Sequence, residues 1–264
     1  MDVINGEWYM RGLDWNDPFR IRTYKELVSW IKEVGFLPLF SNEVNGFSAE
    51  EHVSPNYWWT GDTEQDPWAW REIIASEREV AYGKFFGGRA GFISLEWLPY
   101  FANYRRDGYD FDSRWEEGLA NRREKLIMDK LIGYDDDGDV VWKDEQILTT
   151  NLKKLCGFGK GGEKNFPGIT TGLMMQTYLV IMDFHRRVSK KGEEYGMPVS
   201  VMLPPEAIWG YDLVTSAYSE SPTVSWKRIV SRVKEVFPDA NDDDIIKIIG
   251  KAPDKKIGEV SFEE

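Results

Sequence analysis

The chain has 264 residues, 42% hydrophobic and 14% aromatic, which is enough for one large buried core or two ordinary ones. Its net charge of −12 argues against indiscriminate binding to nucleic acid, and the absence of a long apolar run excludes a transmembrane helix. Because only Cys156 and two histidines are present and no secretory pattern opens the chain, we expect a cytoplasmic protein without disulfide, metal or cofactor, and no membrane partner.

The N-terminal part of the chain alternates turn-rich and apolar segments. Residues 1–21 are aromatic and turn-rich, and we expect them to form an N-terminal arm. Thr23 and Glu26 have the spacing of a capping box, and apolar residues recur at helical spacing from there to Gly35. Asp66-Pro67 is typical of a helix N-cap followed by proline at the first helical position. Two helices are therefore predicted.

A β-hairpin is expected next. Residues 80–86 and 89–93 are apolar and flank Gly87-Gly88, a pair typical of a two-residue hairpin turn. Together with the two helices, this hairpin predicts a first winged-helix-like unit over residues 22–110. The polar segment 107–118 is then a linker that contains the domain boundary.

The order of elements after residue 120 is the most informative pattern. Periodicity and turn residues predict, in chain order, a helix at 121–131, a strand at 140–142, a helix at 150–156, a glycine-rich turn, a long helix from about 169 to 187, and strands near 188 and at 198–203. This is the order of a winged helix-turn-helix, in which the third helix can lie in the major groove while the wing reaches phosphates.

The predicted fold class is α+β, mainly α, with tandem winged helix-turn-helix units that carry small β-hairpin wings. The second unit covers residues 119–210. Residues 211–264 are expected to form C-terminal helices and a charged tail, which starts near Pro253. Nothing in the sequence sets the oligomeric state.

Basic residues are concentrated in the second unit. Residues 150–203 carry eight Lys or Arg against four acids, a net charge of +4, so the remainder of the chain carries −16. This distribution favours contact with double-stranded DNA, damaged DNA included. The candidate DNA-binding residues lie on the hairpins, the glycine-rich turn and the long helix: Lys84, Arg89, Lys160, Lys164, Gln176, Arg186, Lys190 and Lys191. A lysine-rich hairpin tip is also common as a solvated end, so a protein-interaction module stays an alternative.

Three stretches resemble the AlkZ/YcaQ family of bacterial DNA glycosylases, which are built from tandem winged helices. They are residues 71–106, with Val80-Ala81-Tyr82-Gly83-Lys84, residues 151–157, and residues 171–205, with Lys191-Gly192-Glu193-Glu194-Tyr195. The pattern is most similar to the AlkZ-related proteins. The resemblance implies a DNA-binding scaffold with a role in DNA repair or damage recognition.

The same resemblance implies where catalysis would occur. Those glycosylases carry glutamine–aliphatic–glutamine or glutamine–aliphatic–aspartate just after the first helix, and the corresponding residues here are Pro38-Leu39-Phe40. Neither Pro38 nor Phe40 can orient a water molecule or stabilise a sugar cation, so the usual glycosylase chemistry is not expected.

Whether the chain is an enzyme stays open. Glu43 and His52 are the candidate catalytic residues for a glycosylase or hydrolase, because a carboxylate beside a histidine can do acid–base work. The competing interpretation is a helix N-terminus with acidic residues and a capping or solvated histidine. Tyr57-Trp58-Trp59 with Trp68 and Trp70 can stack an unpaired base, although core packing explains these aromatic residues more simply.

Overall fold

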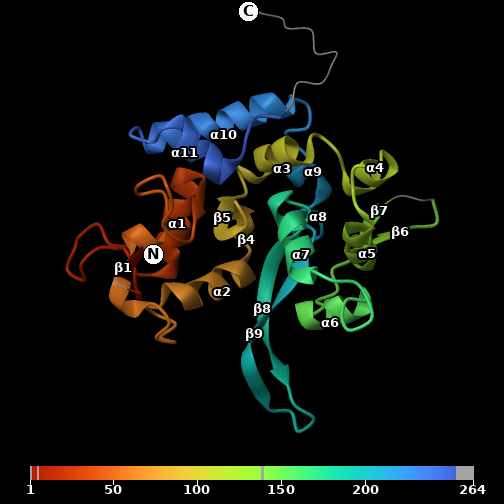
Figure 1. The fold of residues 1–264 in the computed structure, drawn as a ribbon, viewed down its shortest axis with the longest axis horizontal. Coiled ribbons are helices and arrows are strands. Elements are labelled where there is room, and N and C mark those ends of the chain that lie inside the picture. The colour runs from red at the N-terminus through yellow and green to blue at the C-terminus, as the bar shows by residue number, and fades with distance from the viewer. Residues whose placement is uncertain (1, 5, 138–139, 254–264) are drawn as a thin grey trace, which may run out of the picture.

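The structure, a computed structural model, describes residues 2–4, 6–137 and 140–253. Its centre is a five-stranded antiparallel sheet with strands β3 (Phe36–Pro38), β4 (Val80–Phe86), β5 (Arg89–Ser94), β8 (Val180–Val188) and β9 (Glu194–Leu203). The strands lie in the order β3-β5-β4-β8-β9, so the sheet takes three strands from the first half of the chain and two from the second. With helices packed around it, the fold is α+β, as expected (Figure 1).

The first half begins its helices where local polar residues cap them. Helix α1 (Tyr24–Val34) starts after Thr23, whose side chain accepts the amide of Glu26 at 3.2 Å. Helix α2 (Pro67–Glu77) starts after Asp66, with proline in its first turn. Between them lie β3 and two short 3-10 helices, η1 (Glu50–His52) and η2 (Pro55–Tyr57). The predicted caps of both helices are confirmed.

The β4–β5 hairpin turns at Gly87-Gly88, as predicted, with φ values of 58° and 78° that favour glycine. Beyond it come α3 (Leu98–Arg106) and α4 (Phe111–Glu116). The segment expected to be a linker therefore contains a short helix. The N-terminal arm pairs β1 (Asp2–Ile4) with β2 (Glu7–Tyr9).

The second half starts with α5 (Arg122–Leu131), whose N-cap Asn121 forms a complete capping box with Glu124. It is followed by β6 (Ile132–Tyr134), β7 (Val140–Trp142), α6 (Thr149–Leu155) and α7 (Phe166–Met175). Just before α6, Leu148 makes an isolated antiparallel bridge to Val201 of β9. The chain then enters the β8–β9 hairpin.

The long helix predicted from about residue 169 to residue 187 is wrong. Helix α7 ends at Met175, Thr177 adopts a left-handed φ of 62°, and the chain runs as strand β8 from Val180. A short, continuous apolar run fits a buried strand as well as a helix, and here residues 179–182 are all buried within the sheet. Arg186 therefore lies on a strand of the hairpin rather than on a helix.

The C-terminal part of the chain forms α8 (Pro205–Trp209), α9 (Tyr211–Val214), α10 (Pro222–Val236) and α11 (Asp242–Ile249). Helices α10 and α11 lie across the end of the molecule opposite the β8–β9 hairpin (Figure 1). Most of the expected charged tail, residues 254–264, lies outside the described residues. In the described part of the chain, every helix is too short or too polar to cross a membrane.

A buried ion pair ties the two halves together. Arg106, at the end of α3, hydrogen-bonds the carboxylate of Glu206 on α8 and donates to the backbone carbonyl of Thr177 at 2.8 Å. Burial alone would lower the pKa of Arg106, but Glu206 and the neighbouring tyrosines hold it above its ordinary value. Since Thr177 lies directly before β8, this pair fixes the base of the β8–β9 hairpin against the rest of the molecule.

Candidate nucleic-acid interface

The β8–β9 hairpin projects from the body of the protein (Figure 1). Its strands pair from Val180 opposite Leu203 to Val188 opposite Glu194, and β8 meets β4 only at Ile181 opposite Tyr82. Residues 180–182 are buried, whereas residues 185–188 and 190–197 are exposed. The outer half is therefore a two-stranded ribbon in solvent.

Most of the candidate DNA-binding residues of the second unit lie on this ribbon or beside it. Arg186 is on the outer part of β8, and Lys190 and Lys191 are in the loop between the strands. Lys160 and Lys164 lie in the loop between α6 and α7, and all five side chains are exposed. The charges predicted from the sequence therefore lie on accessible surface.

A hollow of about 660 Å³ separates α6 from the hairpin. Lys153 and Lys154 of α6 line one side of it, and Arg187 and Tyr195 of the hairpin line the other. The Arg187 guanidinium lies 5.1 Å from the centre of the Tyr195 ring, a cation–π contact that orients it. Among the residues that the structure describes, the lining of this hollow contains three cations and no carboxylate. Lys153, Lys154 and Arg187 were not singled out from the sequence, although their charges were counted.

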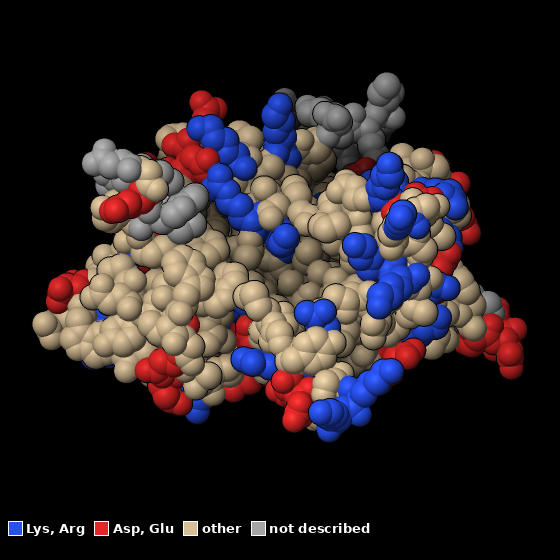
Figure 2. All heavy atoms as spheres, turned by 60° about the horizontal axis from the view of Figure 1, so that its bottom comes forward, with Lys and Arg blue, Asp and Glu red and all other residues tan. Residues whose placement is uncertain are grey.

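Figure 2 shows how charge is distributed over this side of the molecule. Lys and Arg gather around a hollow at the centre and right of the view, while many of the Asp and Glu side chains lie towards the periphery. A chain with a net charge of −12 thus presents a locally basic face. Such a face is the electrostatic feature that binding to phosphates needs.

Two candidates from the first half lie elsewhere. Lys84 is an exposed residue of β4. Arg89 pairs with Glu43, Nη1 to Oε2, at 3.4 Å. The turn of their hairpin faces α11, because a Cβ on Gly87 would lie 3.6 Å from the carbonyl oxygen of Lys247. The structure therefore does not bring Arg89 together with the cations of the β8–β9 hairpin.

Gln176 is held by its own surroundings. It is the C-cap of α7 and is half-buried, and its Nε2 donates to Glu124 at 3.3 Å and to the carbonyl of Gly172 at 3.2 Å. It does not stand on an exposed helix face as the long-helix prediction implied.

The two candidate catalytic residues have different partners in the structure. His52 places Nε2 2.8 Å from the carbonyl oxygen of Gly46, and its ring packs against Trp30 at a centroid distance of 4.0 Å. Glu43 instead pairs with Arg89. Each side chain has a structural partner, and within the described residues no contact joins the two.

Pro38-Leu39-Phe40 lies at the end of β3. Leu39 is buried and its amide donates to the carbonyl of Ala90 at 2.8 Å, while Phe40 packs against Trp58 and Trp68. Beside this segment the buried carboxylate of Glu50 accepts the amides of Arg11 at 2.8 Å and Ser41 at 2.9 Å. This carboxylate therefore holds the arm and the connector in place.

The tryptophan-rich segment next to Phe40 divides into buried and exposed rings. Trp58 and Trp70 are buried, which confirms core packing for these two. Trp59 is 52% exposed and has a left-handed φ of 60°, rare for a bulky residue. Its amide donates to the Asp66 carboxylate at 3.1 Å, and its ring lies 6.4 Å from that of Trp68.

The aromatic segment also contacts the hairpin. The Arg71 guanidinium of α2 lies 3.8 Å from the Trp68 ring centre and 4.5 Å from that of Phe184 on β8. These stacked groups link the loop that carries Trp59 to the base of the basic ribbon.

Comparison with known proteins gives one family match. A family model described as "AlkZ related" matches residues 21–250, which is most of the chain. The comparison with curated proteins and the comparison with solved structures give no match.

Proposed function

The chain belongs to the AlkZ-related family, and from this premise we propose that it is a winged-helix protein that binds double-stranded DNA and acts in DNA repair or damage recognition without the usual glycosylase chemistry. The observation that carries the proposal is the hollow between α6 and the β8–β9 hairpin, lined by Lys153, Lys154 and Arg187. In an acidic chain, three cations gathered without a carboxylate favour a polyanionic ligand.

The strand order supports two winged-helix units, over residues 22–110 and 119–210. In the first half β3 pairs with β5, which pairs with β4. In the second half Leu148 bridges to β9, which pairs with β8. In each half, the extended segment that comes first in the chain therefore pairs with the second strand of the hairpin, which pairs with the first strand of the hairpin. A helix precedes each hairpin, α2 in the first half and α7 in the second. The units meet where β4 pairs with β8.

The shape of the basic face favours docking through the hairpin rather than through a recognition helix. Helix α7 has the sequence FPGITTGLMM and carries no charged side chain. The β8–β9 ribbon carries Arg186, Arg187, Lys190 and Lys191. A two-stranded ribbon fits a major groove, and lysines at its tip reach phosphates.

Trp59 supplies a means of recognising damage. Its backbone amide donates to the Asp66 carboxylate, and its exposed ring lies next to Trp58, which packs against Phe40. Aromatic rings at such positions stack on bases that have left the duplex. This supports recognition of an unpaired base, and Glu43 and His52, the candidates for excising it, contact Arg89 and the carbonyl of Gly46.

Fluorescence anisotropy with a labelled duplex, measured between 50 and 200 mM salt, tests the proposal. Lys190→Ala/Lys191→Ala should lower the affinity about tenfold at low salt and reduce the slope of log K against log salt by about 2. The matched control is Lys227→Ala/Lys251→Ala, which removes two exposed cations from the opposite end of the molecule and should change neither quantity. If the unsubstituted protein fails to bind duplex at low salt, the proposal is wrong and a protein-interaction module takes its place.

A further inference from the structure

A second cavity lies at the other end of the molecule, away from the β8–β9 hairpin. It is open to solvent, has a volume of about 600 Å³ and is lined by the ends of α3, α7 and α11 and by the β4–β5 hairpin. Its walls are mainly apolar, with Phe85, Met175, Ile248 and Ile249 among the lining residues. Cavities of this size and character are typical of sites for small molecules.

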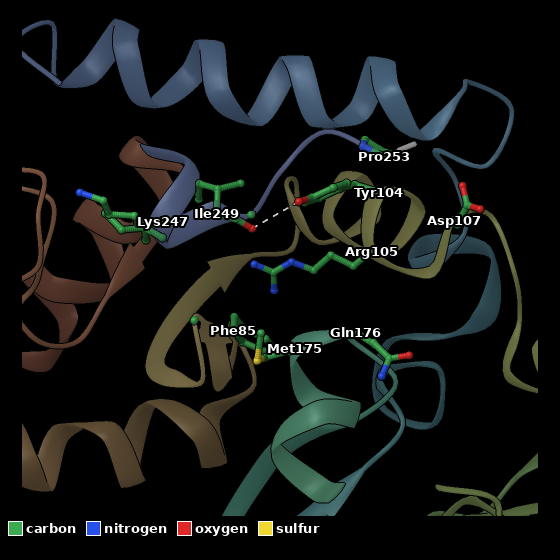
Figure 3. Close-up of a pocket in the computed structure, with 12 residues that line it drawn as sticks. Phe85, Tyr104, Arg105, Asp107, Met175, Gln176, Lys247, Ile249 and Pro253 are labelled. Carbon is green, nitrogen blue, oxygen red and sulfur yellow. Dashed lines mark hydrogen bonds between the residues drawn. The ribbon is translucent and has the colours of Figure 1, made fainter. Parts of the chain in front are cut away.

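Arg105 extends into this cavity from α3, between Ile249 on one side and Phe85 and Met175 on the other (Figure 3). Its Nη1 atom is buried and has no hydrogen-bond partner among the residues that the structure describes. The guanidinium lies 4.7 Å from the centre of the Phe101 ring, a cation–π contact. Burial lowers the pKa of Arg105 to about 10, so the group still carries its charge at neutral pH.

The neighbouring arginine, Arg106, has the hydrogen-bond partners that Arg105 lacks in the part of the chain that the structure describes. Arg106 is buried next to it in the chain, but it is matched by Glu206, Thr177 and Tyr218. Arg105 is partly buried as a residue, but its buried Nη1 has no such partner among the described residues, and leaving a buried cationic group unpaired is costly. An anionic ligand in the cavity would supply that partner.

The other polar groups around the cavity are already engaged or lie away from the guanidinium. Lys247 donates to Asp244 at 2.6 Å, and the Tyr104 hydroxyl donates to the carbonyl of Lys251 at 2.8 Å. Gln176 and Asp107 lie on the far side of the cavity from the Arg105 guanidinium in Figure 3. Arg105 is therefore the group that would bind an anion here.

We propose that this cavity binds a small amphiphilic carboxylate, with its carboxylate on Arg105 and its apolar body against Phe85, Met175 and Ile249. A planar guanidinium matches a carboxylate with two parallel hydrogen bonds, which a lysine cannot do. The proposed carboxylate contacts use none of the residues of the β8–β9 hairpin or of the hollow beside α6.

Calorimetric titration of the full chain with octanoate tests this site, and octanamide serves as the uncharged probe of the same length. We expect saturable one-to-one binding of octanoate and at least about tenfold weaker binding of octanamide, since a charge-assisted hydrogen bond is lost. Arg105→Gln should weaken octanoate binding at least about tenfold, and Arg105→Lys should restore part of it.

Lys247→Gln is the matched control, because it removes a cation from the same cavity that already has a partner in Asp244. Its octanoate affinity should stay within about twofold of the unsubstituted protein. Met175→Glu is a second variant that leaves Arg105 in place and introduces a competing carboxylate at the cavity wall, and it should abolish binding. Circular dichroism and thermal unfolding show whether each variant is folded.

Four results would overturn the proposal. The first is no saturable binding of octanoate by the folded, unsubstituted protein. The second is equal affinity for octanoate and octanamide. The third is an equal loss of octanoate affinity in Arg105→Gln and Lys247→Gln. The fourth is binding that appears only after Glu259→Gln/Glu263→Gln/Glu264→Gln, which would assign the Arg105 cavity to the acidic end of the chain itself.

Discussion

The two large hairpins of this protein have opposite surroundings. The β4–β5 hairpin is buried almost to its turn, with Phe85, Phe86, Phe92 and Ile93 at most 1% exposed. The β8–β9 hairpin is buried only at its base, and beyond His185 its side chains are exposed and rich in cations. The first hairpin therefore builds the core that holds the molecule together, and the second is free to meet a partner.

The difference follows from the residues near each turn. Phe85-Phe86 precedes the β4–β5 turn, and two aromatic rings need a core to cover them. His185-Arg186-Arg187 stands at the corresponding part of β8, where burial would leave charges unpaired. The composition next to each turn therefore decides which hairpin remains exposed.

Removing an aromatic ring from the core hairpin should have the largest effect on stability. Phe86 packs against Phe36, Phe47 and Phe101, so Phe86→Ala should lower the free energy of unfolding by about 3–5 kcal/mol. Val188→Ala, on the exposed hairpin, should change it by less than about 0.5 kcal/mol. Urea unfolding of both variants measures the contrast, and similar losses would show that the two hairpins are equally part of the core.

The second largest effect on stability is expected at the ion pair between Arg106 and Glu206. Glu206→Gln leaves the buried Arg106 without its counter-charge and should cost about 3 kcal/mol, whereas Glu220→Gln, at a more exposed pair with Arg228, should cost less than about 1 kcal/mol. Unfolding in urea gives both values. A cost for Glu206→Gln as small as that of the Glu220 variant would mean that this pair does not hold the β8–β9 hairpin to the body.

Local chemistry made much of the fold predictable. Thr23 and Asp66 cap helices within a few residues of themselves, and Gly87-Gly88 turns a hairpin by its own φ angles. The strand from Val180 was missed because a short apolar run has no distinctive period, and the sheet into which it packs is built from residues about 100 positions earlier. Pairing with a strand far away in the sequence therefore determined the secondary structure of that segment.

The candidate interface was likewise only partly predictable from the sequence. Lys190 and Lys191 could be found from the sequence because a hairpin tip is exposed wherever it lies. The hollow that joins Lys153 and Lys154 to Arg187 exists only once the hairpin folds over α6. Arg105 and Arg106 are adjacent in the sequence, and only the fold gives one of them a carboxylate.

Replacing Trp59 tests whether the first half of the chain, which builds most of the core, also takes part in recognising an unpaired base. Trp59→Ala should weaken binding to a duplex with an unpaired base about tenfold and leave binding to a matched duplex within about twofold, because stacking needs a base outside the helix. Trp115→Ala, another exposed tryptophan, is the control and should affect neither duplex. Equal losses on both duplexes in the Trp59 variant would remove damage recognition from the proposal and leave general DNA binding.

Replacing Arg187 should have the smallest effect. This variant distinguishes DNA contact in the hollow beside α6 from DNA contact at the tip of the hairpin. Arg187→Ala should lower duplex affinity about fivefold and reduce the salt slope by about 1, because one phosphate contact is lost. The stability of the fold should hardly change, since the side chain is exposed and its cation–π contact is with Tyr195, itself an exposed residue. Arg228→Ala, an exposed arginine on α10 that pairs with Glu220, is the matched control in the same anisotropy titration. If Arg187→Ala leaves the salt slope unchanged while the tip variant Lys190→Ala/Lys191→Ala reduces it, DNA contacts the end of the ribbon but does not enter the hollow beside α6.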